Sequence, residues 1–166
     1  MTNSESNTQI KHHIRFATPE DIDTIIFFIN AIAEYEKMQN EVVLKKETLQ
    51  TYLFGERPMA EVLILEQNDK EVGFALFFHN FSTFEGRPGL YLEDLFILPE
   101  YRGFGLGKAA LKKLAAIARE RNCARFEWVC LDWNTPSIEF YVKQGAKAKK
   151  EWIIFRMDGE NLKNYK

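Results

Sequence analysis

The chain has 166 residues, of which 46% are hydrophobic and 28% are charged, and its formal net charge is -2 at pH 7. A chain of this length and composition is expected to form a single domain around one hydrophobic core. The slightly acidic balance provides no basic surface for nucleic acid, so we expect no nucleic-acid partner.

The ends and the rare residue types narrow the expectation further. After Met1, polar residues fill positions 2–9, and no run of about 18 apolar residues follows. We therefore expect a disordered tail at 1–9, a single domain at 10–166, a cytoplasmic location and no membrane partner. Cys123 and Cys130 lie in or beside apolar stretches. The three histidines are not spaced from one another, or from the cysteines, as the ligands of a metal ion are. We expect neither a disulfide nor a metal site.

The pattern of apolar and turn residues predicts alternating helices and strands. Isoleucines recur at helical spacing after Thr18-Pro19, a typical helix start. In the first half of the chain we expect a strand at 12–16, a helix from 19 to about 36, and a helix at 45–54 closed by Gly55 in the left-handed conformation. A hairpin with strands at 60–66 and 72–78 should follow, then a loop at 82–89 and a strand at 90–98. The rest should form a helix from about 106, a strand at 125–131, a helix from about 135 to Gly145, and a last strand at 152–157 before a polar tail.

Three glycines separate the strand at 90–98 from the helix that follows it. They lie in the run Tyr101-Arg102-Gly103-Phe104-Gly105-Leu106-Gly107-Lys108. Glycines at a helix N-terminus let an anion approach backbone N–H groups where the helix dipole is positive. The spacing fits neither a Walker A loop nor the dinucleotide fingerprint, which leaves R-x-x-G-x-G. Alone, this pattern predicts either a phosphate-bearing ligand or an ordinary tight turn.

Two adjacent acids, Glu93 and Asp94, interrupt the otherwise apolar strand at 90–98. Because side chains alternate between the two faces of a strand, at least one of these acids is expected to be partly buried. One interpretation is an edge strand or a bulge with a salt-bridged acid. The other is a carboxylate held beside the glycine loop, where burial would raise its pKa and suit it to accept protons near neutral pH.

The helix that begins near Thr135-Pro136 places Asn134, Ile138 and Tyr141 on one face. With the acidic strand, the R-x-x-G-x-G loop and the run Trp133-Asn134-x-Pro136-Ser137-x-x-Phe140-Tyr141, the chain resembles the GNAT acetyltransferases. It looks most like their diamine (spermidine/spermine) acetyltransferase branch, which includes thialysine-acetylating relatives. The resemblance implies an α/β fold with a mixed, mainly antiparallel sheet flanked by helices, and a homodimer.

The resemblance also implies a reaction. Acetyl-CoA, as co-substrate, would give its acetyl group to a primary amine of a small molecule (a diamine, a polyamine or a thialysine-like amine) by direct attack in a ternary complex. Such an amine arrives protonated, so a base must remove its proton. The likeness assigns this role to Glu93, directly or through water, and assigns to Tyr141 the protonation of the CoA thiolate. Tyr141 could instead be a core aromatic residue beside Phe140.

Binding residues follow from the same resemblance. Those that would hold the coenzyme are Leu95, Phe96 and Ile97 by backbone pairing, Arg102, Gly103, Phe104, Gly105, Leu106, Gly107 and Lys108 at the diphosphate, and Asn134, Pro136 and Ser137 near the thiol. Those that would bind the amine are Tyr35, Glu36, Glu93, Glu127 and Trp128. Glu36 could also be a surface charge, and strand alternation alone would explain the residue types at 127 and 128.

One departure from the polyamine-acetylating relatives concerns the stretch before Trp152. Those relatives carry several acids there, whereas this chain has the run Lys147-Ala148-Lys149-Lys150-Glu151. A shorter diamine, or a lysine-like amine with a carboxylate, is therefore at least as good a candidate as a long polyamine. Two other functions stay open: a protein-lysine acetyltransferase, and a non-catalytic acyl-CoA sensor, against which the presence of both Glu93 and Tyr141 argues.

Overall fold

A computed structural model describes residues 10–166, so the tail expected at 1–9 lies outside the described residues. The chain divides into two compact units, one ending at Val129 and the other beginning at Cys130. The expectation of a single domain over 10–166 stays a prediction. None of the helices described over these residues is long and apolar enough to span a membrane.

The first unit is built on a five-stranded sheet in the order β1-β2-β3-β4-β5. The strands are β1 His12–Phe16, β2 Glu61–Gln67, β3 Lys70–Ser82, β4 Arg87–Ile97 and β5 Arg125–Trp128. Neighbours from β1 to β4 pair antiparallel, and β4 pairs with β5 in parallel. The mixed, mainly antiparallel sheet predicted from the sequence is confirmed.

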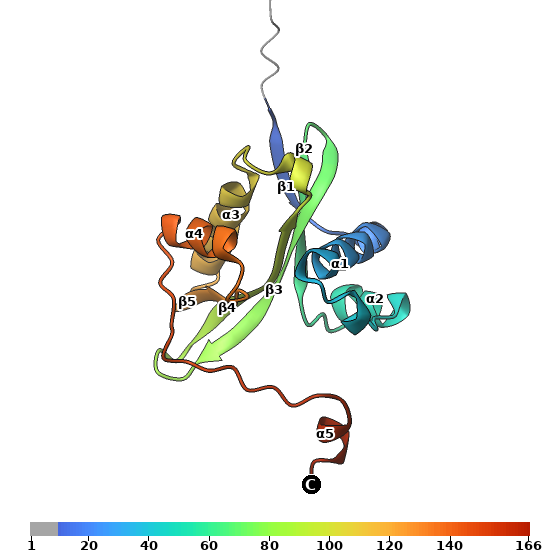
Figure 1. The fold of residues 1–166 in the computed structure, drawn as a ribbon, viewed down its shortest axis with the longest axis vertical. Helices are drawn as coiled ribbons and strands as arrows, with labels where there is room; N and C mark the ends of the chain where they lie inside the picture. Colours follow the sequence, from blue (N-terminus) through green and yellow to red (C-terminus); the bar gives the residue numbers. More distant parts are fainter. Residues whose placement is uncertain (1–9) are drawn as a thin grey trace, which may run out of the picture. The chain divides into compact units, whose positions relative to one another are not determined.

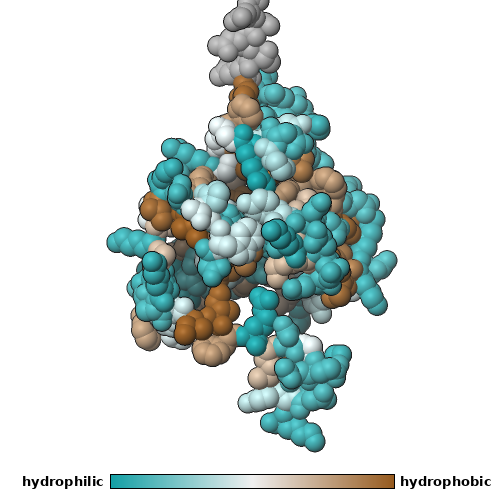
Figure 2. All heavy atoms as spheres, viewed as in Figure 1, coloured by the Kyte–Doolittle hydropathy of each residue, from teal (hydrophilic) through white to brown (hydrophobic). Residues whose placement is uncertain are grey.

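Helices cover both faces of this sheet (Figure 1). They are α1 Ile22–Glu36 and α2 Lys46–Phe54 on one face and α3 Leu106–Glu120 on the other, with short 3-10 turns η1 Pro19–Asp21, η2 Gln39–Glu41 and η3 Pro99–Tyr101. The apolar stripe of α1 packs on the sheet, where the rings of Phe28 and Phe74 stack at 5.7 Å. Most of the surface seen in Figure 2 is hydrophilic, as expected for helices whose apolar faces point inward.

A network around Arg15 fixes the start of α1 to the sheet. The guanidinium of Arg15 binds both oxygens of Asp21, at 2.7 and 2.9 Å, and also binds Glu66 and Glu71 at 2.7 Å each. Asp21 in turn accepts a hydrogen bond from the backbone N–H of Thr18 at 2.7 Å. Hydrogen bonding to Arg15 lowers the pKa of Asp21 to about 2, although partial burial opposes this shift.

One local prediction for the first unit is wrong, and another is correct only in part. Gly55 ends α2 in an extended conformation, with φ at -77°, and a Cβ there would lie 2.4 Å from the carbonyl oxygen of Thr51. Close approach rather than a left-handed cap therefore explains this glycine. The loop expected at 82–89 is shorter than predicted: the turn spans only residues 83–86, because β3 extends to Ser82 and β4 begins at Arg87, its partner. Pro88 is tolerated near the strand start, where its carbonyl accepts from the N–H of Ala124 at 2.7 Å.

The second unit contains α4 Thr135–Lys143 and a short helix, α5 Gly159–Asn164, which was not predicted. The strand predicted at 152–157 is absent: within residues 130–166 the chain there is extended without a partner strand. A strand needs a hydrogen-bonded partner strand to be stable, and residues 130–166 of the second unit supply none. The strand predicted at 125–131 ends earlier, at Trp128.

Candidate functional site

A β-bulge in β4 shapes the acidic part of the candidate site. Leu76 of β3 pairs with Asp94 and Phe77 with Leu92, so Glu93 has no partner in β3. The extra residue bends the strand and resets which side chains face inward. As a result the side chain of Glu93 is exposed, whereas Asp94 is half-buried. The structure therefore contains the bulge of the first interpretation of this acid pair.

Burial gives Asp94 unusual acid chemistry. Its pKa is raised to about 7, first by desolvation and then by the negative charges of Glu93 and Glu36. Glu36, at the end of α1, also has a raised pKa because it is partly desolvated. The structure thus brings Glu36, Glu93 and Asp94 together as an acidic cluster of one helix and one strand. A cluster of this kind favours a cation and can accept a proton near neutral pH.

Beyond the bulge, β4 has an open edge. β5 pairs with β4 only from Gly89 to Leu92, and no strand among residues 10–166 pairs with the same side of β4 further on. The carbonyl of Phe96 points toward Gly73 of β3. Because backbone directions alternate along a strand, those of Leu95 and Ile97 point to the open side. An extended ligand could pair with the backbone of Leu95 and with the N–H of Ile97, because the Ile97 carbonyl accepts from Arg102 and the backbone of Phe96 faces β3.

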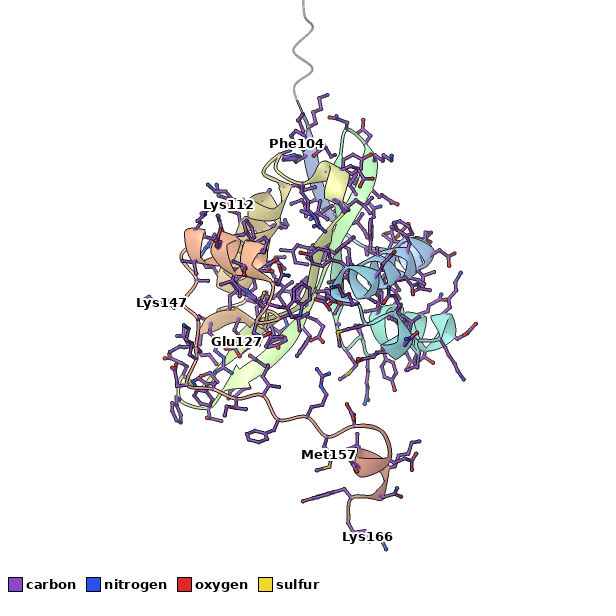
Figure 3. All side chains as sticks on the ribbon, in the orientation of Figure 1. Phe104, Lys112, Glu127, Lys147, Met157 and Lys166 are labelled. Carbon is purple, nitrogen blue, oxygen red and sulfur yellow. The ribbon has the colours of Figure 1, made fainter. Side chains whose placement is uncertain are left out.

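The glycine loop joins this open edge to α3. Gly103 and Gly105 have φ angles of +85° and +89°, and Gly105 is the N-cap of α3. A Cβ at Gly103 would meet nothing within 4 Å, so positive φ rather than crowding selects glycine there. Residues 102–105 are exposed, and Figure 3 shows Phe104 at the turn that leads into α3. An exposed turn before a long helix fits the diphosphate of a coenzyme.

Arg102 at the start of this loop points back toward the sheet. Its Nε donates to the carbonyl oxygen of Ile97 at 2.8 Å. Its guanidinium lies 4.8 Å from the ring centroid of Tyr35 and 5.4 Å from that of Phe96. Tyr35, predicted to bind the amine, and Arg102, predicted to bind the coenzyme, are therefore neighbours.

Glu127 and Trp128 lie on β5, and Figure 3 labels Glu127 there. The Glu127 carboxylate accepts from Asn80 Nδ2 at 3.0 Å and pairs with Arg125 Nε at 2.8 Å. Asn80 reaches β5 across Gly89, where a Cβ would lie 2.2 Å from Asn80 Oδ1. Both oxygens of Glu127 are engaged, so this acid has less negative charge to offer an amine than Asp94 does.

In the second unit, Asn134 begins α4 as the motif predicts. It is buried, and its Oδ1 accepts from the backbone N–H of Ser137 at 3.3 Å, with Pro136 in the first turn. Tyr141 is half-buried on the same helix, with its ring 5.3 Å from that of Phe140. Tyr141 and Glu93 belong to different units, so their joint role in one site stays a prediction.

The structure also shows what sequence reasoning missed. Asp94 belonged to the acid pair seen in the sequence, but no local pattern indicated which of the two acids would be buried. The contacts of Arg102 join residues that are distant in sequence, and no spacing pattern indicates them.

Within residues 10–166, His, Cys, Asp and Glu side chains form no group of three or more that could hold a metal ion.

Comparisons with known proteins agree with this geometry. The model of the acetyltransferase (GNAT) family matches residues 28–146. A thialysine N-epsilon-acetyltransferase of Sus scrofa is 36% identical over 161 residues, which cover 90% of this chain and 94% of the relative. An L-ornithine N5-acetyltransferase of Arabidopsis thaliana is 29% identical over 194 residues, covering 90% and 85%. The solved structure of an integron cassette protein from V. cholerae superimposes with a TM-score of 0.75 at 27% identity, covering 92% and 95%.

Proposed function

Because the chain belongs to the acetyltransferase (GNAT) family, we propose that it transfers the acetyl group of acetyl-CoA to a primary amine of a small molecule. The observation that carries this proposal is the acidic cluster of Glu36, Glu93 and Asp94 beside an open strand edge and a glycine loop. The cluster suits a cationic acceptor, and the edge and loop suit an extended coenzyme.

The acceptor we favour is a lysine-like amine, with diamines and polyamines as further candidates. Thialysine and ornithine, which appear in the names of two relatives, are amino acids with a terminal side-chain amine. The single acid among the residues at 147–151 also supports an acceptor shorter than a polyamine. The ammonium of such a molecule would be attracted by the acidic cluster.

The coenzyme would be held by two parts of the first unit. The backbone of Leu95 and the N–H of Ile97 would pair with its pantetheine arm along the open edge of β4. The N–H groups around Gly103 and Gly105, with Lys108 on the first turn of α3, would bind its diphosphate. When bound, acetyl-CoA supplies the thioester carbonyl that the amine attacks.

Proton removal is the step that this chain's own residues explain most directly. An alkyl ammonium with a pKa of about 10 is not a nucleophile until it loses a proton. We assign that proton to Asp94, whose pKa lies near neutral, and place Glu93 on the exposed side to pass it to water. This extends the assignment of Glu93 alone. The neutral amine would then attack directly in a ternary complex, and Tyr141 would protonate the departing thiolate.

We further propose a homodimer in the cytoplasm. The run Trp152-Ile153-Ile154-Phe155 supports association, since its side chains are 66 to 90% exposed. Exposed apolar runs of this kind mark protein–protein contacts. A concentration-dependent mass by light scattering tests the dimer, and a monomer at all concentrations would contradict it.

Release of the CoA thiol tests the function. Acetyl-CoA is mixed with thialysine, ornithine, a short diamine, spermidine and a lysine-containing peptide, and the thiol is measured over time. We expect the highest kcat/KM with thialysine or ornithine. Release with the peptide alone would favour a protein-lysine acetyltransferase. Binding of acetyl-CoA without release for any amine would favour an acyl-CoA sensor.

A further inference from the structure

The side chain of Arg102 joins the glycine loop to α1 and β4 of the first unit. It is bonded to the carbonyl of Ile97 at the end of β4, and its guanidinium lies over the rings of Tyr35 on α1 and Phe96 on β4. Both ring distances, 4.8 and 5.4 Å, are within the range of a cation–π contact. The residue that starts the glycine loop therefore touches the helix that carries Glu36.

Hydrogen bonds hold the residues that precede Arg102, whereas the space around Gly103, which follows it, is open. The Arg102 N–H bonds the carbonyl of Pro99 at 3.2 Å, and Lys70 Nζ bonds the hydroxyl of Tyr101 at 2.8 Å. Gly103, which follows, has positive φ and nothing within 4 Å of a would-be Cβ. An anion bound at Gly103 and Gly105 would thus lie directly beside Arg102 in the sequence, where no side chain blocks its approach to Gly103.

At the other end of the contact, Tyr35 lies in the last turn of α1, next to Glu36. The helix ends at Glu36, the C-cap Lys37 adopts the left-handed conformation at φ +61°, and the Met38 N–H bonds the carbonyl of Ala33 at 2.8 Å. Helix ends lack part of their internal hydrogen bonds and open more readily than helix centres. A cation held over Tyr35 therefore stabilises the turn that positions Glu36.

We propose that Arg102 couples the coenzyme site to the amine site: coenzyme at the glycine loop fixes Arg102, which in turn holds Tyr35 and the last turn of α1. This inference rests on the proposed function and concerns the regulation of the same site. The side chain of Arg102 acts here as a positioning residue, because it works through Tyr35. By reciprocity, the amine must strengthen coenzyme binding by the same factor that coenzyme strengthens amine binding. For one hydrogen bond and two exposed cation–π contacts, we expect a factor of about 3 to 10.

Hydrogen exchange with CoA as the only ligand tests this coupling without knowledge of the amine. In the unmodified protein, saturating CoA should slow exchange in the loop peptide at 102–110 and also, about 3- to 10-fold, in the peptide at 33–38. Arg102→Met and Tyr35→Leu should each remove the CoA-dependent slowing at 33–38. Tyr35→Leu leaves the loop residues intact, so it should keep the slowing at 102–110. Lys113→Met, which removes an exposed charge from α3, is the matched control and should behave as the unmodified protein.

A binding measurement with thialysine as the probe gives a second readout. Its dissociation constant should fall about 3- to 10-fold when CoA is present, and Tyr35→Leu should abolish that ratio rather than only weaken binding. Absence of any CoA effect on the loop would contradict the proposed function, and this inference with it. Loop protection with no change at 33–38, or with the same change in both variants, would overturn the coupling alone.

Discussion

The first unit contains two groups of carboxylates in opposite electrostatic situations. Asp21, Glu66 and Glu71 surround Arg15, and hydrogen bonding to it lowers the pKa of Asp21 to about 2. In the acidic cluster, burial and like charges instead raise the pKa of Asp94 to about 7. The first group shares one cation and stabilises the fold, whereas the second can bind a cationic substrate and accept a proton near neutral pH.

Asp94→Asn should have the largest effect on activity. It removes the proton acceptor with little change in size, so we expect kcat/KM to fall by about 100-fold or more. Steady-state release of the CoA thiol measures this. Glu93→Gln should cost less, and Asp69→Asn, in the exposed turn between β2 and β3, is the control that should cost nothing. A larger loss in Glu93→Gln than in Asp94→Asn would return the role of base to Glu93.

Arg15→Met should have the largest effect on stability. It leaves three carboxylates without their cation, so we expect a loss of about 2 to 3 kcal/mol in the free energy of unfolding, less than for a fully buried ion pair because Arg15 is partly exposed. Urea unfolding at pH 7 measures this loss. The kcat/KM of the folded fraction should stay unchanged. An equal loss in Lys113→Met would show that the effect is not specific to the network.

Asp94→Asn should also stabilise the protein, which makes the contrast between the two groups sharper. A carboxyl with a raised folded-state pKa binds its proton more tightly folded than unfolded, so stability falls as pH rises from about 4 to about 7. Asparagine cannot ionise, and at pH 8 we expect a gain of about 1 to 2 kcal/mol. Urea unfolding at pH 8 and pH 5 tests this, and the gain should be smaller at pH 5.

The helices and strands of the fold were easier to predict from the sequence than the burial and contacts of the site residues. The residue types in R-x-x-G-x-G were sufficient to predict a glycine turn between a strand and a helix, because positive φ is a local property. The burial of Asp94 was not predictable, because one unpaired residue at Glu93 reverses the facing of every side chain after it. The strand expected at 152–157 failed for a related reason: apolar alternation permits a strand, but only a partner edge makes one.

An effect of similar size concerns stability in acid and separates the two groups by pH. Since the folded-state pKa of Asp21 is lowered, the stability that it contributes is present above its unfolded pKa of about 4 and is lost as pH falls toward 2. After allowance for solvent screening we expect about 1 to 2 kcal/mol. Asp21→Asn should therefore lower stability at pH 6 and lose this effect near pH 2. The pH dependence of kcat/KM should have its midpoint at a higher pH, because kcat/KM falls as Asp94 becomes protonated below about pH 7. If the two transitions coincided, unfolding rather than protonation of Asp94 would explain the loss of activity in acid, and the contrast between the two groups would fail.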